Sequence, residues 1–369
     1  MLPSYGIPIH PRDLLAIAAA LRARDVFTPT FLAPEVDLYD PAVYLHEAHV
    51  FSTSTFLLVD RNILSRLVAL VRGAMPSPEH RLAAGVLAFA QCAGISVEPN
   101  IALYELARSD DPLNASGELK AFRLADRVHP AHWAQIALGQ EDVLRELPEA
   151  IPASENDLSV DFSMQLTRYR RNYILSLKIA ELELEGGSPV ERMSRLISWM
   201  YLDFLFGGPA IALAAHRLAP NASRKRLFKG LRSLDRENAI AGIRNAAWDL
   251  TMVSEWLLNV ANQERDVRLT LLTTFDRGLH RLARSAADIE GVARDRQDHL
   301  RRALVGLWGI RSGERLADQL AQCYASHDNP KRQINRPVGP DFVTTCIETG
   351  EAAVRGWKPG AGDNTRWIR

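Results

Sequence analysis

The chain has 369 residues, of which 47% are hydrophobic and 24% are charged, a composition typical of a globular protein and not of a disordered one. Lysine plus arginine and aspartate plus glutamate both number 44, so the chain as a whole has no net charge that would attract nucleic acid or anionic membranes. The three cysteines, Cys92, Cys323 and Cys346, lie far apart and form no CxxC pair, which argues against a zinc knuckle or a disulfide framework.

Two stretches bear on where the protein is located. The amino terminus, MLPSYGIPIHPRDLL, lacks the basic start, apolar core and cleavage site of a secretory signal. The most apolar stretch, 199–215, is interrupted by Asp203 and by a Gly-Gly-Pro break, so it predicts two buried helices and no membrane span. With cysteines suited to a reducing compartment, we expect a cytoplasmic protein without a membrane partner.

Residues 1–110 predict the first part of an α/β domain, with a loop-rich lead-in at 25–50. TFLLVD (55–60) is short and apolar, as a buried parallel strand should be, and GISVEPN (94–100) predicts a second strand that proline stops. Helical periodicity predicts helices at 11–24, 63–73, 80–94 and 101–109. This alternation favours a parallel sheet.

The rest of the chain divides into three parts. Residues 111–236 lose the strand signal and predict a large helical insertion. Residues 237–290 resume the alternation, with a long helix at 237–262, a strand at 267–276 and a helix at 278–290. Residues 291–369 predict an extension that begins as a charged helical pair and becomes irregular, either loosely ordered or wrapped over the rest.

One pattern occurs twice. FLLVDRNIL (56–64) and LLTTFDRGL (271–279) both place an aspartate between an apolar strand and a helix. Because the carboxyl ends of parallel strands lie along one edge of a sheet, Asp60 and Asp276 should face the same crevice. The alternative is that each aspartate only caps its helix, a role worth about 1 kcal/mol.

Two further acids stand out on predicted helices. Asp249 shares a helix face with Met252, Val253 and Trp256, and a carboxylate on such an apolar stripe has to be paired, protonated or bound to a cation. A salt bridge to Arg244 or Arg277 is the simpler account of Asp249. Glu105 follows the second strand, where it is either a solvated face residue or a ligand, and Glu98 is its substitute at the end of that strand.

Together these features resemble the PIN-domain family of metal-dependent nucleases. The family has a strand ending in an aspartate with a small polar residue two places on, a glutamate on a helix after the second strand, an aspartate on a later helix, and a last strand ending close to Thr-x-Asp. The matching stretches are VDRN (59–62), EPNIALYELA (98–107), NAAWDLTMVSEW (245–256) and LTTFDRGL (272–279).

The resemblance implies a three-layer α/β domain with a parallel sheet, interrupted here by the helical insertion. It implies that the catalytic, metal-binding acids are Asp60, Glu105, Asp249 and Asp276, with Asn62 and Thr274 in supporting places. Carboxylates without histidine or cysteine suit Mg²⁺ or Mn²⁺, which could activate water against a phosphodiester. Such closely packed like charges repel, so we expect the site to be poorly formed without metal.

Two basic clusters predict a surface for RNA. In RYRRNY (168–173) tyrosines alternate with Arg168, Arg170 and Arg171, and RKRLFKGLR (224–232) contains Arg224, Lys225 and Arg226. Arginine contacts to phosphate and bases stacked on aromatic rings hold single-stranded RNA in many proteins. The alternative is that both clusters are the polar faces of amphipathic helices.

The leading hypothesis is a cytoplasmic metal-dependent hydrolase of PIN type, a nuclease acting on RNA more than on DNA. By resemblance, many relatives are toxins of toxin–antitoxin pairs or defence nucleases, so an inhibitory protein partner fits the hypothesis, and so does an oligomer. The alternative is a non-enzymatic helical interaction protein whose α/β part is structural. The sequence has no P-loop, dinucleotide-binding or hydrolase-elbow motif that would favour another enzyme class.

Overall fold

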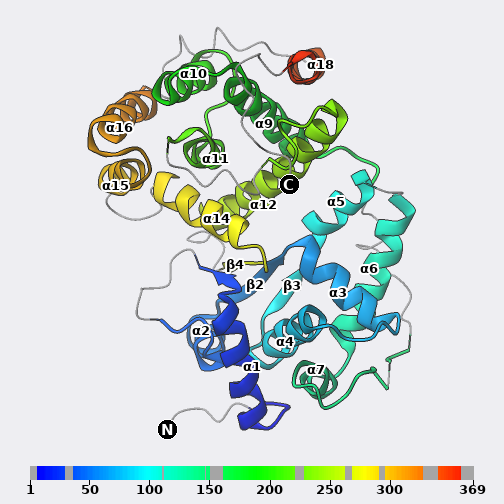
Figure 1. Ribbon diagram of the computed structural model, residues 1–369. Helices are drawn as coiled ribbons and strands as arrows, with labels where there is room; N and C mark the ends of the chain where they lie inside the picture. The colour runs from blue at the N-terminus through cyan, green and yellow to red at the C-terminus, as the bar shows by residue number, and fades with distance from the viewer. Residues whose placement is uncertain are drawn as a thin grey trace. The chain divides into compact units, whose positions relative to one another are not determined.

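The computed structural model describes residues 6–29, 36–109, 112–145, 147–149, 161–220, 228–261, 268–290, 296–326 and 340–358. The chain forms two compact units. The first comprises residues 1–165 and 255–280, and the second comprises residues 166–254 and 281–369. The fold of the described residues is mixed α/β and mostly helical, with one small sheet (Figure 1).

The sheet belongs to the first unit and has four strands in the order β1-β4-β2-β3. These strands are β1 (Phe27–Thr28), β2 (Ser54–Val59), β3 (Ser96–Glu98) and β4 (Arg268–Thr273). β2 runs parallel to both β3 and β4, whereas β1 pairs antiparallel with β4. The three predicted strands are therefore confirmed, but the expected all-parallel sheet is wrong, because an unpredicted two-residue strand closes one edge in the opposite direction.

Helices surround this sheet in the first unit (Figure 1). They are α1 (Pro11–Arg24), α2 (Pro41–Phe51), α3 (Arg61–Val71), α4 (Pro78–Cys92), α5 (Asn100–Ser109), α6 (Pro112–Arg127) and α7 (Pro130–Ala137). α3 is amphipathic, with Ile63, Leu64, Leu67 and Val68 buried on one face. α2 replaces part of the predicted loop-rich lead-in, because Asp40 caps it and Pro41 occupies its first turn.

The core of the first unit lies against one face of the sheet. Alternate residues of the strands point into it, and Leu57, Val59 and Leu271 are completely buried there. Full burial of such side chains contributes about 1.5 to 3 kcal/mol each, so the register of β2 against β4 is strongly specified. That register places Val59 beside Thr273 at the carboxyl ends of the two strands.

The second unit is helical. Its helices are α9 (Thr167–Glu185), α10 (Pro189–Leu202), α11 (Gly208–Leu218), α15 (Arg296–Trp308), α16 (Ile310–Ala325) and α18 (Pro340–Gly356). α12 (Arg236–Ala261) and α14 (Arg277–Glu290) contain the boundaries between the units. The Gly-Gly-Pro break does separate two buried helices, α10 and α11, as predicted.

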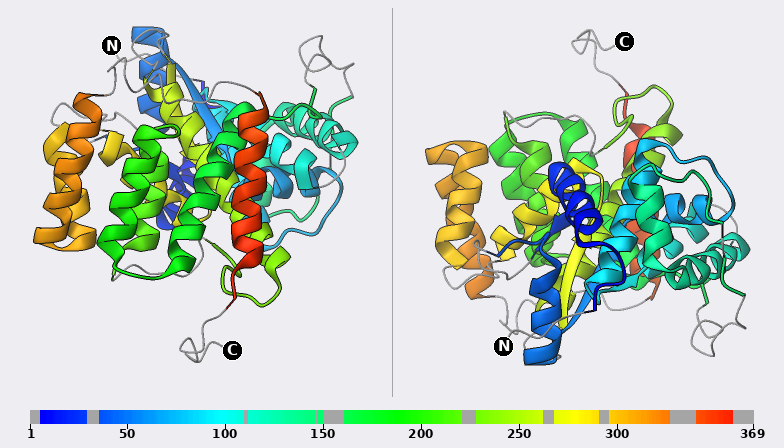
Figure 2. Two further views of the ribbon diagram at one scale, coloured as in Figure 1. Left: turned by 90° about the horizontal axis from the view of Figure 1, so that it is seen from above. Right: turned by 90° about the horizontal axis from the view of Figure 1, so that it is seen from below.

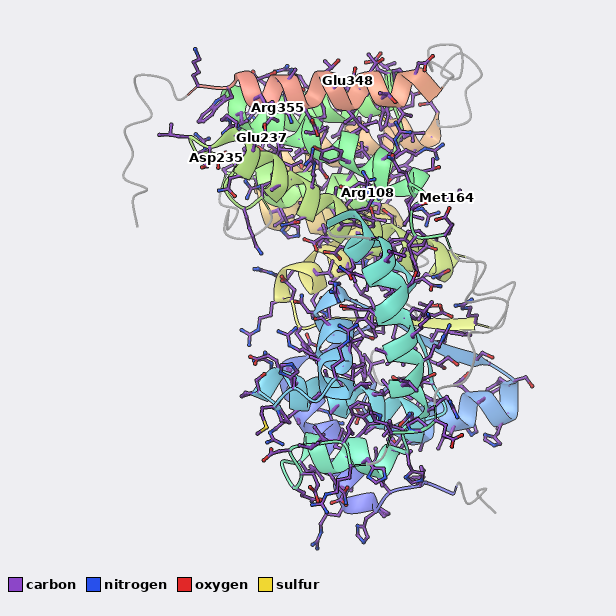
Figure 3. All side chains as sticks on the ribbon, turned by 90° about the vertical axis from the view of Figure 1, so that its right-hand side faces the viewer. Arg108, Met164, Asp235, Glu237, Glu348 and Arg355 are labelled. Carbon is purple, nitrogen blue, oxygen red and sulfur yellow. The ribbon has the colours of Figure 1, made fainter. Side chains whose placement is uncertain are left out.

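The carboxyl-terminal helix α18 packs along α9 (Figure 2). Glu351 accepts hydrogen bonds from Tyr173 on α9 and from Arg244 on α12, and Arg355 pairs with Glu237 at 2.6 Å (Figure 3). The described end of the extension therefore packs on α9 and α12 of the second unit, and residues 340–356 are helical where an irregular segment was expected.

The described helices were also compared with the requirements of a bilayer span. None of them combines the length and the apolar character needed to cross a membrane.

Candidate functional site

The carboxyl ends of β2 and β4 lie side by side. The Asp60 N–H, directly after β2, donates to the carbonyl of Thr273 at 3.1 Å, which extends the ladder by one residue. Thr274 follows β4 and is completely buried. The expected placement of both strand ends at one edge of the sheet is confirmed, whereas the crevice that Asp60 and Asp276 were expected to face stays a prediction.

Asp60 is a buried carboxylate held by three donors. Its Oδ1 accepts from the backbone N–H of Asn62, which makes it the cap of α3. Its Oδ2 accepts from the Thr274 hydroxyl and from the Asn62 side-chain amide, the latter at 3.2 Å. Asn62 and Thr274 therefore both contact the aspartate, and their supporting role in a metal site stays a prediction.

Thr274 connects Asp60 to Asp276. The hydroxyl that donates to Asp60 also accepts the Asp276 N–H at 3.0 Å. The Asp276 Oδ1 accepts from the N–H groups of Gly278 and Leu279, so this aspartate caps α14. Its Oδ2 has no hydrogen bond to any residue in the described ranges, and the side chain is exposed.

Glu105 lies in the same electrostatic environment. Burial, and then the negative charge of Asp60, raise the pKa of Glu105 to about 7, while Arg61 acts in the opposite direction. Burial also raises the pKa of Asp60, and the charge of Asp276 adds to this, although the hydrogen bonds from Thr274 and Asn62 lower it. The three acids of the first unit thus interact electrostatically through Asp60.

The residues beside these acids are strongly paired. Arg61 makes a two-pronged ion pair with Glu118 on α6, at 2.8 and 3.1 Å. Glu98, the substitute for Glu105, accepts from the Asn100 amide and lies 3.8 Å from Arg268. Glu98 is therefore engaged by its own neighbours, and the choice between Glu98 and Glu105 stays a prediction.

Asp249 lies on α12 in the second unit, half-buried, whereas the other three acids belong to the first unit. Of the two arginines expected as its alternative partner, Arg244 pairs with Glu351 at 2.8 Å, and a salt bridge to Arg277 stays an open alternative. The role of Asp249 as a fourth ligand stays a prediction.

The basic cluster RYRRNY forms the start of α9. Tyr169 and Tyr173 are buried, and Tyr169 stacks on Trp248 with ring centroids 4.1 Å apart. The idea that these tyrosines stack on RNA bases is therefore wrong for the chain as it is folded. Of the arginines, Arg170 donates to Thr344 at 2.8 Å and Arg168 is half-buried, whereas Arg171 is exposed. The other predicted basic residues, Arg224, Lys225 and Arg226, lie outside the described residues.

Within the described ranges, no group of three or more histidine, cysteine, aspartate or glutamate side chains gathers closely enough to hold a metal ion. Asp60, Glu105 and Asp276, which interact electrostatically, offer carboxylate oxygens, the hard ligands that Mg²⁺ and Mn²⁺ prefer.

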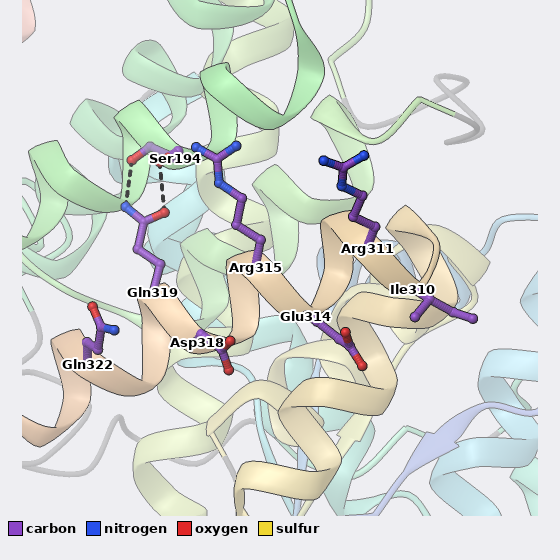
Figure 4. A pocket seen from close by; sticks show the side chains of 8 residues that line it. All are labelled: Ser194, Ile310, Arg311, Glu314, Arg315, Asp318, Gln319 and Gln322. Atoms are coloured by element: carbon purple, nitrogen blue, oxygen red, sulfur yellow. Dashed lines mark hydrogen bonds between the residues drawn. The ribbon is translucent and has the colours of Figure 1, made fainter.

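The second unit contains a groove of about 680 Å³ between α10 and α16 (Figure 4). Gln319 joins the two helices, since its amide accepts from the Ser194 hydroxyl at 2.8 Å and donates to the Ser194 carbonyl at 3.1 Å. Arg311 and Arg315 project from one side of α16, with Glu314 on the other (Figure 4). None of the predicted site residues lines this groove.

The sequence did not reveal the role of His280. This buried histidine lies four residues after Asp276 on α14, and its ring contacts both Thr28 and the carbonyl of Thr274. Its position on the buried face of α14, with Leu279 and Ala283, could have been predicted from the sequence. Its contact with Thr28 could not, because Thr28 is 252 positions away in the chain.

The chain was also compared with known proteins. No protein-family model matches it, no curated protein matches it and no solved structure matches it. A function for this chain therefore has to rest on the chemistry of its own residues.

Proposed function

We propose that the chain is a divalent-metal-dependent phosphodiesterase that cleaves RNA, with the carboxylates at the ends of β2 and β4 as its reactive centre. The observation that carries this proposal is the linkage of Asp60 to Asp276 through the buried hydroxyl of Thr274. Asp60 and Asp276 follow two neighbouring parallel strands, and Glu105 interacts electrostatically with Asp60. Negative charge is therefore concentrated at the edge where ligands of open α/β sheets bind.

The donor set supports a hard cation. A carboxylate has about four acceptor positions, and the protein uses three of them on Asp60 and two on Asp276. Each aspartate can therefore cap its helix and still offer an oxygen to a cation. Mg²⁺ or Mn²⁺ bound there would stabilise the charge that develops on a phosphodiester during hydrolysis.

The protein's own residues divide the remaining work. Asp60 is fixed by its three donors, so it provides a rigid anchor. Glu105 has a pKa of about 7, so near neutral pH it can either accept a proton from water or release one to a leaving oxygen. Asp276 is exposed and its Oδ2 faces no competing hydrogen bond within the described chain.

The experiment compares Asp60→Asn and Asp276→Asn with the unmodified chain. Asparagine caps helices as well as aspartate does, and neither variant supplies the anionic ligand. Asp276→Asn should therefore fold normally, whereas Asp60→Asn also replaces an acceptor oxygen with an N–H donor and should be less stable. We expect Mn²⁺-dependent cleavage of single-stranded RNA to fall at least about 100-fold in each, on the scale of lost catalytic interactions. Thermal unfolding and circular dichroism would verify the fold.

The matched control is Asp40→Asn. Asp40 caps α2 by accepting the Ala42 N–H at 2.9 Å, the same local role that Asp60 plays for α3. Activity should survive in this variant. If all three variants retained RNA cleavage, or if the unmodified chain neither bound Mn²⁺ nor cleaved RNA, the proposal would be refuted.

One observation favours the non-enzymatic alternative, a helical interaction protein with a structural α/β part. Both Asp60 and Asp276 already cap helices, which would justify their presence without any ligand. A toxin or defence role, with an inhibitory protein partner, separates the two hypotheses in cells. Expression of the unmodified chain should arrest growth and expression of Asp60→Asn should not, whereas an interaction protein would behave identically in both forms.

A further inference from the structure

A chain of buried polar contacts continues from the aspartates to the edge strand β1. The His280 Nε2 lies 3.0 Å from the carbonyl oxygen of Thr274, and its Nδ1 is hydrogen-bonded to the hydroxyl of Thr28 on β1. Thr28, Thr274 and His280 are all buried. The Thr274 N–H also donates to the carbonyl of Val26, just before β1, at 3.1 Å.

The contacts require a proton on one ring nitrogen. A carbonyl oxygen can only accept, so Nε2 must carry a proton. The Thr28 hydroxyl can donate or accept, so it pairs with Nδ1 whether or not that nitrogen carries a proton. The histidine therefore bridges β1 and the residue that follows β4, with one contact to each.

The backbone of Thr274 is thus held on both sides. Its N–H donates to the Val26 carbonyl, and its carbonyl accepts from the His280 ring. This matters because the hydroxyl of the same residue links Asp60 to Asp276. A rotation of the Thr274 backbone would move the hydroxyl away from the Asp60 carboxylate or from the Asp276 N–H.

We propose that His280 is a positioning residue, which holds Thr274 so that its hydroxyl meets both aspartates. The inference rests on the proposed function for its purpose, because the aspartates are the proposed metal ligands. It goes further in assigning the alignment of these ligands to the ring of His280, a residue whose backbone N–H also donates to the Asp276 carbonyl at 3.1 Å.

The first test measures hydrogen exchange of the Asp276 amide, which needs no metal. In His280→Leu this amide should exchange at least about tenfold faster, because its acceptor, the Thr274 hydroxyl, is no longer held. In His280→Gln the amide nitrogen of glutamine can replace Nε2–H as donor to the Thr274 carbonyl, so the exchange rate should return to within about threefold of the original.

The second test measures Mn²⁺ affinity by calorimetry on variants that remain folded. His280→Leu should weaken Mn²⁺ binding about tenfold, on the scale seen for residues that orient metal ligands, and His280→Gln should restore it. In a Thr274→Val background the same histidine substitution should have no further effect, because the hydroxyl through which it acts is gone.

The matched control is His216→Leu in the second unit, where Nε2 of a half-buried histidine is hydrogen-bonded to the Ser285 hydroxyl at 2.7 Å. It should change neither the exchange of the Asp276 amide nor Mn²⁺ affinity. Normal exchange in His280→Leu, or failure of His280→Gln to restore it, would overturn the positioning role. If the unmodified chain bound no Mn²⁺, the proposed function would fail while the exchange test still decided the role of His280.

Discussion

Replacement of Thr274 by valine gives the most direct test of the proposed centre. Valine has nearly the same shape as threonine but lacks the hydroxyl, so the packing of this completely buried position is kept while two hydrogen bonds are lost. A hydrogen bond to a charged group contributes about 1.5 to 3 kcal/mol, and the exposed Asp276 can partly replace its lost bond with water. We expect Thr274→Val to lower the free energy of unfolding by about 2 to 3 kcal/mol.

The assay is urea unfolding followed by circular dichroism, carried out in EDTA so that metal binding does not contribute. Thr274→Ser is the matched control, because it keeps the hydroxyl and loses only a buried methyl group, at a cost of about 1 kcal/mol. A double-mutant cycle with Asp60→Asn isolates the link between the two side chains. The coupling energy should be at least about 1 kcal/mol, since the bond to a neutral amide is weaker than that to a carboxylate.

Two results would contradict this reasoning. Equal losses of stability in Thr274→Val and Thr274→Ser would mean that the hydroxyl contributes little. A coupling energy near zero would mean that Thr274 and Asp60 do not interact in solution, and the linkage on which the proposed centre depends would be absent.

Three further predictions concern single sites. Because the pKa of Glu105 is raised to about 7, its ionisation destabilises the fold as pH rises from about 4.5 to about 7. The free energy of unfolding of Glu105→Gln, relative to that of the unmodified chain, should therefore increase by about 2 to 3 kcal/mol from pH 5 to pH 8. Urea unfolding in EDTA measures this difference. A gain that did not depend on pH would contradict this. Arg217→Ala should cost about 3 to 5 kcal/mol, because it leaves Glu183 buried without its partner, and the combined change to Arg217→Met and Glu183→Leu should recover most of that loss. Gly350→Leu should detach α18 and speed its proteolysis, since a Cβ there would lie 2.9 Å from α9, whereas Gly356→Ala, with open space around it, should not.

The strands were predictable because their chemistry is local. β2 and β4 are apolar runs bounded by an aspartate, and β3 is a short stretch that Pro99 stops. β1 was not predictable, since two residues carry no periodic signal and Phe27 pairs with Thr273, which is 246 positions further along the chain. The antiparallel edge of the sheet follows from that long-range pairing and from nothing in the local sequence.

The missed helices share one cause. Proline was taken as a break in residues 25–50 and in the carboxyl-terminal extension, yet Pro41 and Pro340 each stand at the first position of a helix. Proline is well suited to that position, because its missing N–H would be unpaired there in any case. The aspartate cap at Asp40 was the signal that distinguishes a start from a stop.

In the basic cluster RYRRNY, helical periodicity and not composition determines which side chains are exposed. Tyr169 and Tyr173 are four residues apart and therefore share a helix face, and that face is buried against Trp248. Arg171 lies between them on the exposed side. The alternation of aromatic and basic residues thus follows from an amphipathic helix, and a nucleic-acid surface would have to use the arginines without the rings.

Helix capping and metal ligation use the same carboxylate oxygens, and the two aspartates differ in how many of these oxygens already accept hydrogen bonds. Asp60 uses both oxygens and is buried, so removal of its charge by Asp60→Asn affects the anchoring of the whole edge as well as any ligand. Asp276 caps α14 through Oδ1 alone and is exposed, so Asp276→Asn removes little besides the charge of the carboxylate. A residue that only caps would tolerate this substitution completely, whereas a ligand would not. Asp276 is therefore the position at which the enzymatic and the structural hypotheses differ most.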